Sequence, residues 1–400
     1  MSGQTSNHSS LKGKQIPDLR EHLLTCVLPF WEQHSIDEEH GGFITHLARG
    51  GAVTDDSEKL LVMQSRMIYS FAVGAALGGP PEWLRMAGQG VAFLFRHFRD
   101  YTNDGWYWST NREGRPRQTE KRTYGHASAA YALAEYGRIA HDSRALAAAT
   151  HTWSLVQNYL WDNEHNGAIE SCDRAWNPSG KGHSMGTHLH LMEALLALNE
   201  ASGGNRFWPR VRWLGDLIVE RMVEPRHRCG LESFECDWAC DLQANLVNYG
   251  HNLEAAWLLL RADQIEAIPS YRHTARQFLD YCLQFGLDEK QGGICSHGPL
   301  GQSATLREKI WWVQTEAMVA FLLGYIVFGD QRYWDAFRSV VDFSLRCLHD
   351  QEQGEWYASV DETGAPRSTD KGSEWKAAYH ITQACCYAHE YLQEIQPEVC

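Results

Sequence analysis

The sequence has little of what a membrane or nucleic-acid-binding protein needs. No window reaches the roughly 18 consecutive apolar residues of a membrane span. Lysine and arginine form no cluster, and the net charge of −14 opposes binding to nucleic acid or an anionic membrane. Residues 1–15 are polar and lack the apolar stretch of a signal peptide. We therefore expect a disordered N-terminal lead, followed by a cytoplasmic protein.

Paired cysteine spacing is also missing. The eleven cysteines are odd in number and irregularly spaced, which excludes a disulfide framework and favours a reducing compartment. Cys229, Cys236 and Cys240, with His227 nearby, form the tightest cluster. A zinc site usually has closer paired spacing, so this cluster is a weak candidate.

What the chain does contain is an internal repeat. Glycine-containing turns recur between helical patterns, and the glycines stand at positions 42, 105, 167, 230, 293 and 354. The steps between them are 63, 62, 63, 63 and 61 residues. A repeat of this length indicates stacked structural units, and glycine suits turns that need a positive φ.

Each interval has room for two helices. The first begins near residue 60, 123, 186, 247, 309 or 375 and is apolar on all sides, which predicts burial. The second is amphipathic, near 83–98, 144–160, 207–223, 268–285 and 331–347, and the segment 16–33 supplies a sixth. No linker divides them. The sequence therefore predicts an all-α fold, a single (α/α)6-barrel domain over residues 16–396 whose hairpins are joined by short β-turn connections.

Polar and aromatic residues recur in the first turns of the apolar helices, about 19 to 26 residues after each turn glycine. They are Arg66, Tyr124, His190, His251, Glu254, Trp312, Glu316, Trp375 and His380. A shared offset places them at one level of the barrel, where free N–H groups of the helix N-termini would also favour an anionic intermediate. This convergence predicts a site.

The residue types indicate proton transfer on a sugar. Histidine both takes and gives a proton near neutral pH, and tryptophan faces suit the C–H faces of a sugar ring. His190 is followed by Glu193 and His251 by Glu254, three residues on, which fits glutamates that orient their neighbouring histidines. A pair of histidines around one carbon favours abstraction and return of a proton over hydrolysis.

Other interpretations remain open at this stage. The repeated His-x-x-Glu spacing is also typical of metal sites in helical bundles. Two carboxylates, Glu254 and Glu316, would suit an (α/α)6 glycoside hydrolase. A sugar-binding protein without catalysis would have no need of paired histidines. His126, His183 and His188 are interpreted as structural or rim residues, with His188 close enough to support the site.

Several motifs together resemble the N-acylglucosamine 2-epimerase superfamily, which includes cellobiose 2-epimerases, mannose 2-epimerases and aldose–ketose isomerases such as mannose isomerase. The resemblance covers about residues 19–392. It rests on Pro29-Phe30-Trp31, Gly41-Gly42-Phe43, Ser65-Arg66, Thr187-His188-Leu189-His190 with Glu193, Gly250-His251-Asn252-Leu253-Glu254, Trp311-Trp312-Val313-Gln314-Thr315-Glu316, and Glu374-Trp375-Lys376 with Tyr379-His380.

The resemblance implies residue roles. His251 and His380 would be the paired acid/base catalysts, and Arg66 and His190 would hold the oxygens on C1 and C2 of the sugar. The residues that it implies bind or orient the substrate are Tyr124, Glu254, Trp312, Glu316 and Trp375. It also implies a small-molecule sugar substrate, no metal and no redox cofactor. Helical barrels of this kind occur as monomers and homodimers.

One position departs from the family pattern. Relatives that act on cellobiose usually have asparagine where this chain has Gly186. We therefore expect action at C1/C2 of a free hexose, as isomerisation of D-mannose to D-fructose, 2-epimerisation between D-mannose and D-glucose, or both. A cellobiose 2-epimerase is the alternative within the family.

Replacing His251 or His380 by alanine is expected nearly to abolish turnover, because a positioned general base contributes about 10²–10⁴-fold. The measurement is the rate of sugar conversion by each purified variant. A variant that keeps more than about a tenth of the activity would contradict the acid/base assignment.

Overall fold

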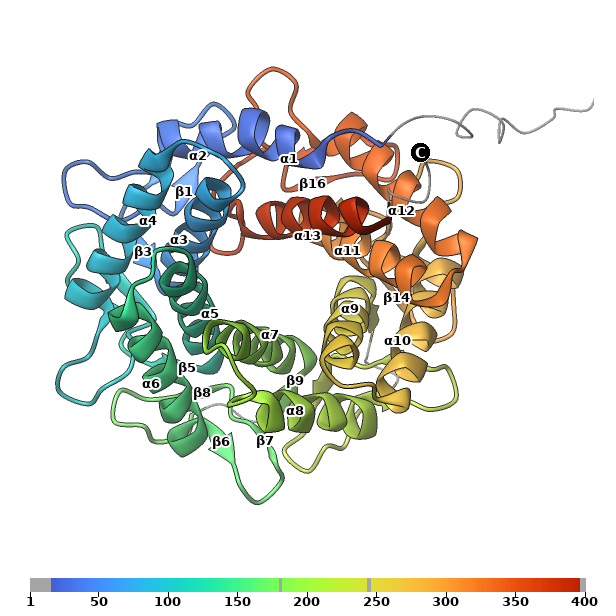
Figure 1. Cartoon of the computed structure of the whole chain (residues 1–400), viewed down its shortest axis with the longest axis horizontal. Coiled ribbons are helices and arrows are strands. Elements are labelled where there is room, and N and C mark those ends of the chain that lie inside the picture. Colours follow the sequence, from blue (N-terminus) through green and yellow to red (C-terminus); the bar gives the residue numbers. More distant parts are fainter. Residues whose placement is uncertain (1–15, 180–181, 243–245, 396–400) are drawn as a thin grey trace, which may run out of the picture.

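Two concentric rings of helices make up the fold in the computed structural model, which describes residues 16–179, 182–242 and 246–395 (Figure 1). The inner ring consists of α3 (Leu61–Ala76), α5 (Thr123–Ile139), α7 (Met185–Ala201), α9 (Tyr249–Ile265), α11 (Trp311–Phe328) and α13 (Tyr379–Ile395). Each inner helix contacts the next, and α13 contacts α3, so the ring closes. The predicted (α/α)6 barrel is confirmed.

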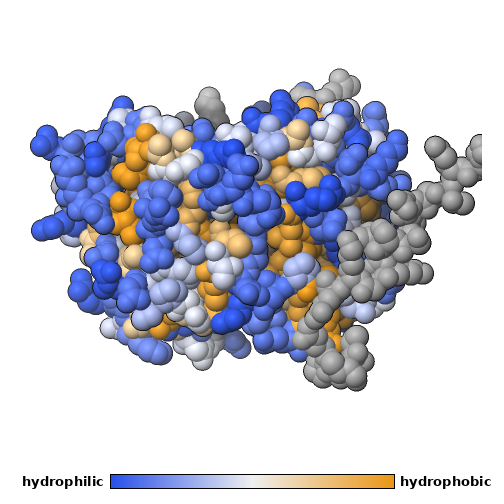
Figure 2. All heavy atoms as spheres, turned by 90° about the horizontal axis from the view of Figure 1, so that it is seen from above, coloured by the Kyte–Doolittle hydropathy of each residue, from blue (hydrophilic) through white to orange (hydrophobic). Residues whose placement is uncertain are grey.

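The outer ring supplies the second helix of each hairpin. Its members are α1 (Leu19–His22), η1 (Leu23–Val27) and α2 (Leu28–His34); α4 (Pro81–Phe93) with η2 (Leu94–Phe98); α6 (Ser143–Tyr159); α8 (Trp208–Arg221); α10 (Pro269–Tyr281) with η3 (Cys282–Gly286); and α12 (Gln331–Phe343) with η4 (Ser344–Leu348). The η segments are π-helical turns. The face of the molecule seen in Figure 2 is largely hydrophilic, with several apolar strips.

The helix α11 shows why the inner ring forms. Its 18 residues are apolar enough, by length and composition, to cross a membrane, which the sequence analysis did not anticipate. In the structure, 72% of this segment is buried by neighbouring helices. Its hydrophobic residues therefore belong to the barrel core.

Short antiparallel strands join neighbouring hairpins at one end of the barrel. The pairs between repeats are β3 (Glu58–Leu60) with β4 (Ser109–Asn111), β5 (Lys121–Arg122) with β8 (Ser171–Cys172), β9 (His183–Ser184) with β12 (Ser233–Phe234), β13 (Leu246–Asn248) with β14 (His297–Pro299), and β15 (Lys309–Ile310) with β16 (Ser359–Val360). The strand β16 also pairs with β17 (Pro366–Ser368) of its own loop. Within single loops, β1 (His46–Leu47) pairs with β2 (Val53–Asp55), β6 (Trp161–Asp162) with β7 (Gly167–Ala168), and β10 (Val223–Glu224) with β11 (Cys229–Gly230).

These loops also cap the inner helices. The first N–H of α7, at Met185, donates to the carbonyl of Glu232 in the loop of the following hairpin, at 2.9 Å. Equivalent bonds cap α3, α5, α9 and α11, with Trp108, Glu170, Ser296 and Ala358 as acceptors. The expectation of free N–H groups facing the site is therefore wrong for these first N–H groups, because each is already satisfied.

A buried polar side chain on five of the inner helices fastens the turn that precedes it. Gln314 of α11 accepts from the N–H of Ile294 and donates to its carbonyl, both at 2.7 Å. The corresponding side chains in the other repeats are Gln64, His126, His188 and Asn252. We call these five residues the latch residues. They satisfy backbone groups that burial would otherwise leave unpaired.

The latches correct the predicted repeat register in two places. In every turn, an N–H group donates to the carbonyl of an acidic residue four positions earlier in the chain. The residue directly after this donor begins the segment that leads into the latch position. These next residues are 42, 105, 167, 229, 293 and 355. Gly230 and Gly354 are therefore one residue away from the true equivalents, Cys229 and Glu355. Glu355 itself adopts a φ of 57°.

The sixth repeat differs from the rest. Its inner helix α13 begins at Tyr379, not near 375, so Trp375 lies in the loop ahead of the helix. At the latch position stands Lys376, whose Nζ donates to Oε1 of Glu355 at 2.6 Å in a buried ion pair. The other predicted helix starts agree with the structure to within two residues. The predicted disordered lead, residues 1–15, lies outside the described residues.

Replacing Gln314 by alanine is expected to lower the free energy of unfolding by about 2–4 kcal/mol, because each buried backbone group left without a partner costs about 1–3 kcal/mol. Urea unfolding of the variant and the wild type would measure this difference in the free energy of unfolding. As a control, Gln393→Ala removes an exposed glutamine of α13 and should change stability by less than about 0.5 kcal/mol. Equal effects for both variants would contradict the latch role.

Candidate active site

The latches place the first side chains of the site. Arg66, His190, Glu254 and Glu316 each lie two residues after a latch residue, on α3, α7, α9 and α11. All four are buried. Because each latch fixes the height and rotation of its helix, residues at the same offset converge at one level, as the sequence predicted.

His251 of α9 is supported from a loop. Its Nδ1 lies 2.6 Å from Oε2 of Glu232, which follows β11. The imidazole lies 5.0 Å from the ring of Trp312, measured between centroids. A Cβ atom added to Gly186 would lie 3.2 Å from Nε2 of His251, so the glycine leaves the space beside this nitrogen open.

His380 of α13 has a second carboxylate partner. Its Nδ1 lies 2.8 Å from Oε1 of Glu316, whose Oε2 accepts from the indole N–H of Trp257 at 2.7 Å. Burial, followed by the charge of Arg66, lowers the pKa of His380 well below its usual value. Burial raises the pKa of Glu316 to about 8. Near neutral pH the imidazole of His380 is therefore neutral, and the carboxyl group of Glu316 beside it keeps its proton.

Arg66 is the fixed positive charge of the site. Its guanidinium donates to the carbonyl of Trp375 and, at 2.8 Å, to the hydroxyl of Tyr124. Its Nη2 also lies 3.4 Å from Nε2 of His380. The ring of Trp375 is 44% exposed and meets Tyr124 edge-on, with the centroids 5.5 Å apart. Burial raises the pKa of Tyr124 to about 12, so the phenol keeps its proton at neutral pH.

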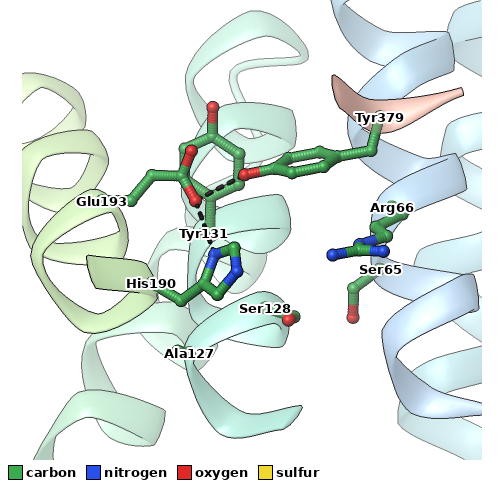
Figure 3. A pocket seen from close by; sticks show the side chains of 8 residues that line it. All are labelled: Ser65, Arg66, Ala127, Ser128, Tyr131, His190, Glu193 and Tyr379. Atoms are coloured by element: carbon green, nitrogen blue, oxygen red, sulfur yellow. Dashed lines mark hydrogen bonds and ion pairs between the residues drawn. The ribbon is translucent and has the colours of Figure 1, made fainter. Parts of the chain in front are cut away.

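His190 lies on a hydrogen-bonded network with Glu193 and Tyr379 (Figure 3). Its Nδ1 is 3.2 Å from Oε2 of Glu193, and that carboxylate also accepts from Tyr379 and Gln383. A cavity of about 10 Å³, room for about one water molecule, lies beside His190 and Arg66. Burial lowers the pKa of His190, which favours its neutral form.

Glu254 is the least satisfied group of the site. Its Oε1 lies 3.9 Å from Nδ1 of His190, and its buried Oε2 has no hydrogen-bond partner among the described residues. Burial raises the pKa of Glu254 well above its usual value, and the charges of Glu316 and Glu193 raise it further. The carboxyl group therefore holds a proton near neutral pH and has a free position for a ligand.

The described residues contain two groups with metal-ligand potential. His190, Glu193 and Glu254 offer ligand atoms within 4.8 Å of one another, as do His22, Cys26 and His349 at the outer ring. The cluster of Cys229, Cys236 and Cys240 is not among them. In the first group, Glu193 is already used by Tyr379 and Gln383, which suits a structural hydrogen bond better than coordination.

The structure brings together all nine residues that the sequence singled out, and it adds Glu232 as the partner of His251. The interpretation of His126, His183 and His188 as structural is confirmed, since each bonds to backbone atoms of a turn. His188 latches Ala168 and contacts no member of the predicted site in the hydrogen bonds described. Glu232 was missed because it lies in a loop 19 residues before His251, at no helical spacing from it.

Comparison with known proteins adds independent evidence. Residues 42–384 match the profile of the N-acylglucosamine 2-epimerase (GlcNAc 2-epimerase) family. A cellobiose 2-epimerase from Bacteroides fragilis is 27% identical, over 92% of this chain and 97% of the relative. An N-acylglucosamine 2-epimerase from Bos taurus is 28% identical, over 93% and 90%. The solved cellobiose 2-epimerase from Bacillus thermoamylovorans superimposes with a TM-score of 0.88 at 26% identity, covering 94% of this chain and 98% of that one.

Replacing Glu254 by glutamine is expected to flatten the dependence of stability on pH. The raised pKa means that the folded protein keeps a proton that the unfolded chain releases, so wild-type stability falls as the pH rises above the usual glutamate value. The fall reaches at most about 1.4 kcal/mol per pH unit for one proton. Urea unfolding near pH 5 and near pH 8 would measure it, because about three pH units separate the two.

The matched control is Glu82→Gln, at an exposed glutamate in the first turn of α4. It should leave the pH dependence unchanged. If Glu254→Gln retained the full wild-type slope, Glu254 would not be the protonated group.

Proposed function

We propose that this chain, which belongs to the N-acylglucosamine 2-epimerase family, isomerises or epimerises a free hexose at C1 and C2. It is an enzyme of the epimerase and isomerase class, as its relatives are. Our proposed reaction is the conversion of D-mannose to D-fructose, to D-glucose, or to both. Protein side chains take the proton from the sugar and return it, and the intermediate is an enediolate.

The observation that carries this proposal is the pair of histidines with separate supports. His251 projects from α9 and His380 from α13, and the ring of Trp312 on α11 lies 5.0 Å and 6.0 Å from them. Each holds its Nδ1 on a carboxylate. Nε2 is therefore the nitrogen that each histidine turns toward the sugar, and in His380 it lies 3.4 Å from Nη2 of Arg66. Two proton carriers allow removal on one face of C2 and return on the other, which is what 2-epimerisation needs.

The proposed sequence starts with the open-chain aldose, whose C1 aldehyde acidifies the hydrogen on C2. One histidine takes that proton, and the electron pair forms a C1–C2 double bond with negative charge on O1. Arg66 and the protonated Tyr124 stand as donors for this oxyanion. Return of a proton to the opposite face of C2, as O1 reverts to the aldehyde oxygen, gives the 2-epimer. Transfer of the O2 proton to O1, with delivery of the carbon-bound proton to C1 and formation of the C2 carbonyl, gives the ketose.

A glycoside hydrolase suits this site less well. A glycosidase needs one carboxylate that stays ionised while the other is protonated. Here burial raises the pKa of both candidates, Glu254 and Glu316. Glu316 is also committed to His380 and Trp257.

A free hexose is favoured over a disaccharide by Gly186. Cellobiose-acting enzymes that the sequence resembles usually have asparagine at the position of Gly186. A side chain at this position would crowd Nε2 of His251. The second candidate function is a cellobiose 2-epimerase, favoured by the name of the relative from Bacteroides fragilis. The half-exposed Trp375 would then have a second sugar unit to stack on.

The experiment that tests the proposal is an NMR time course of D-mannose with the enzyme in D₂O, following the hydrogens on C1 and C2. Deuterium on C2 of glucose would establish epimerisation, and fructose would establish isomerisation. Conversion should persist after treatment with a chelator, because the proposed chemistry uses only protein side chains.

Cellobiose is the parallel substrate. Exchange at C2 of its reducing end with mannose untouched would select the second candidate. Absence of exchange with every sugar, while the protein stays folded, would contradict the acid/base function and leave sugar binding. Release of a new reducing end from an oligosaccharide would instead support a hydrolase.

A further inference from the structure

We propose that Glu232 is a positioning residue, which fixes the imidazole of His251 and stabilises the positive charge that it carries during proton transfer. This inference rests on the proposed function and goes beyond it, since it separates the duties of the two histidines. Glu232 lies outside the helices that build the site, between β11 and β12.

The contact between Glu232 and His251 is short, and the backbone that carries Glu232 is held in place. Oε2 of Glu232 lies 2.6 Å from Nδ1 of His251, which is shorter than the 2.8 Å between Oε1 of Glu316 and Nδ1 of His380. The backbone of Glu232 is fixed because its carbonyl caps Met185, the first residue of α7. A carboxylate on such a base holds an imidazole in one tautomer and one orientation. Nε2 is then the nitrogen left for the substrate.

The preceding repeat provides an internal comparison. Glu170 stands two residues after Ala168 as Glu232 stands two residues after Gly230, and both carbonyls cap an inner helix. The side chain of Glu170 accepts from Ser184 and Thr187, at the start of α7. The same loop position therefore holds a carboxylate with a structural task in one repeat, and a carboxylate on a histidine in the next.

The two histidines differ in the charges that face them. His380 has Arg66 3.4 Å from Nε2, and the carboxyl of Glu316 is shared with Trp257. His251 faces the carboxylate of Glu232. It also faces His190, His380 and His297, and a positive charge on His251 would repel the positive forms of these three histidines. Burial opposes ionisation of Glu232, but the charge of His251 and its hydrogen bond bring the pKa of Glu232 below its usual value. The ionised carboxylate thus compensates a proton on His251, whereas Arg66 opposes one on His380.

The test compares Glu232→Gln with the wild type in steady-state kinetics on the sugar that the protein converts. We expect kcat to fall about 10²-fold, since the acid/base function is weakened and not removed. KM should stay within about threefold, because the substrate contacts remain. Loss of the carboxylate favours neutral His251, so the limb of the pH–rate profile that reports this histidine should move to lower pH.

Glu170→Gln is the matched control. It removes the carboxylate from the same loop position and weakens the start of α7, so a lower melting temperature with an unmoved pH profile is expected. The inference is overturned if the profile of Glu232→Gln does not move, if Glu170→Gln moves it equally, or if KM rises while kcat is unchanged. Glu232→Asp keeps the charge on a shorter arm and should recover part of kcat without the shift in profile.

A second measurement needs no substrate. In ¹⁵N-histidine-labelled protein, the strongly hydrogen-bonded Nδ1 proton of His251 should give a deshielded NMR signal that disappears in Glu232→Gln and persists in Glu170→Gln. Persistence in Glu232→Gln would overturn the inference. If the wild type exchanges no sugar but this signal behaves as expected, the proposed function fails and the Glu232–His251 contact stands.

Discussion

The fold depends on the bond between a buried polar side chain and the backbone of a buried turn. An inner helix that is apolar on all sides has no preferred rotation about its axis, since every face is compatible with the core. A latch such as Gln314 removes this freedom, because only one rotation and one height satisfy both backbone groups of Ile294. Residues two positions later then point into the barrel. The latch thereby turns a hydrophobic ring into a frame for Arg66, His190, Glu254 and Glu316.

The site gathers charge that the core would otherwise reject. Burial raises the pKa of Glu254 and of Glu316, and the charge of Glu193 raises both further, while the positive charge of Arg66 lowers both. The protein meets this excess with retained protons and hydrogen bonds, at a cost in stability that binding of a sugar can offset. Clusters of carboxyl groups with raised pKa values are typical of active sites.

Much of this was predictable from the sequence, because helices report their inward faces through periodic spacing. The repeat placed five of the six inner helices to within two residues and singled out nine residues that the structure brings together. It misjudged the turns at Gly230 and Gly354, since a glycine is conspicuous in sequence while the bonded position is not. Glu232 was invisible, because loop residues reach the site through tertiary contacts that no period encodes. The late start of α13 was also missed. In this repeat the ion pair of Lys376 and Glu355 replaces the amide or imidazole latch, and the periodic spacing does not encode this tertiary contact.

The closed ring has a consequence for the way this protein could have acquired its activity. α3, α5, α7, α9, α11 and α13 each contribute side chains to one level of the barrel, so no hairpin contains even a rudimentary version of the site. The ends of the ring meet where Arg66 of the first inner helix donates to the carbonyl of Trp375 ahead of the last. The position of the Arg66 guanidinium is thus set only when the first inner helix has met the loop ahead of the last one. A chain in which the ring is still open would therefore hold the side chains of the site apart.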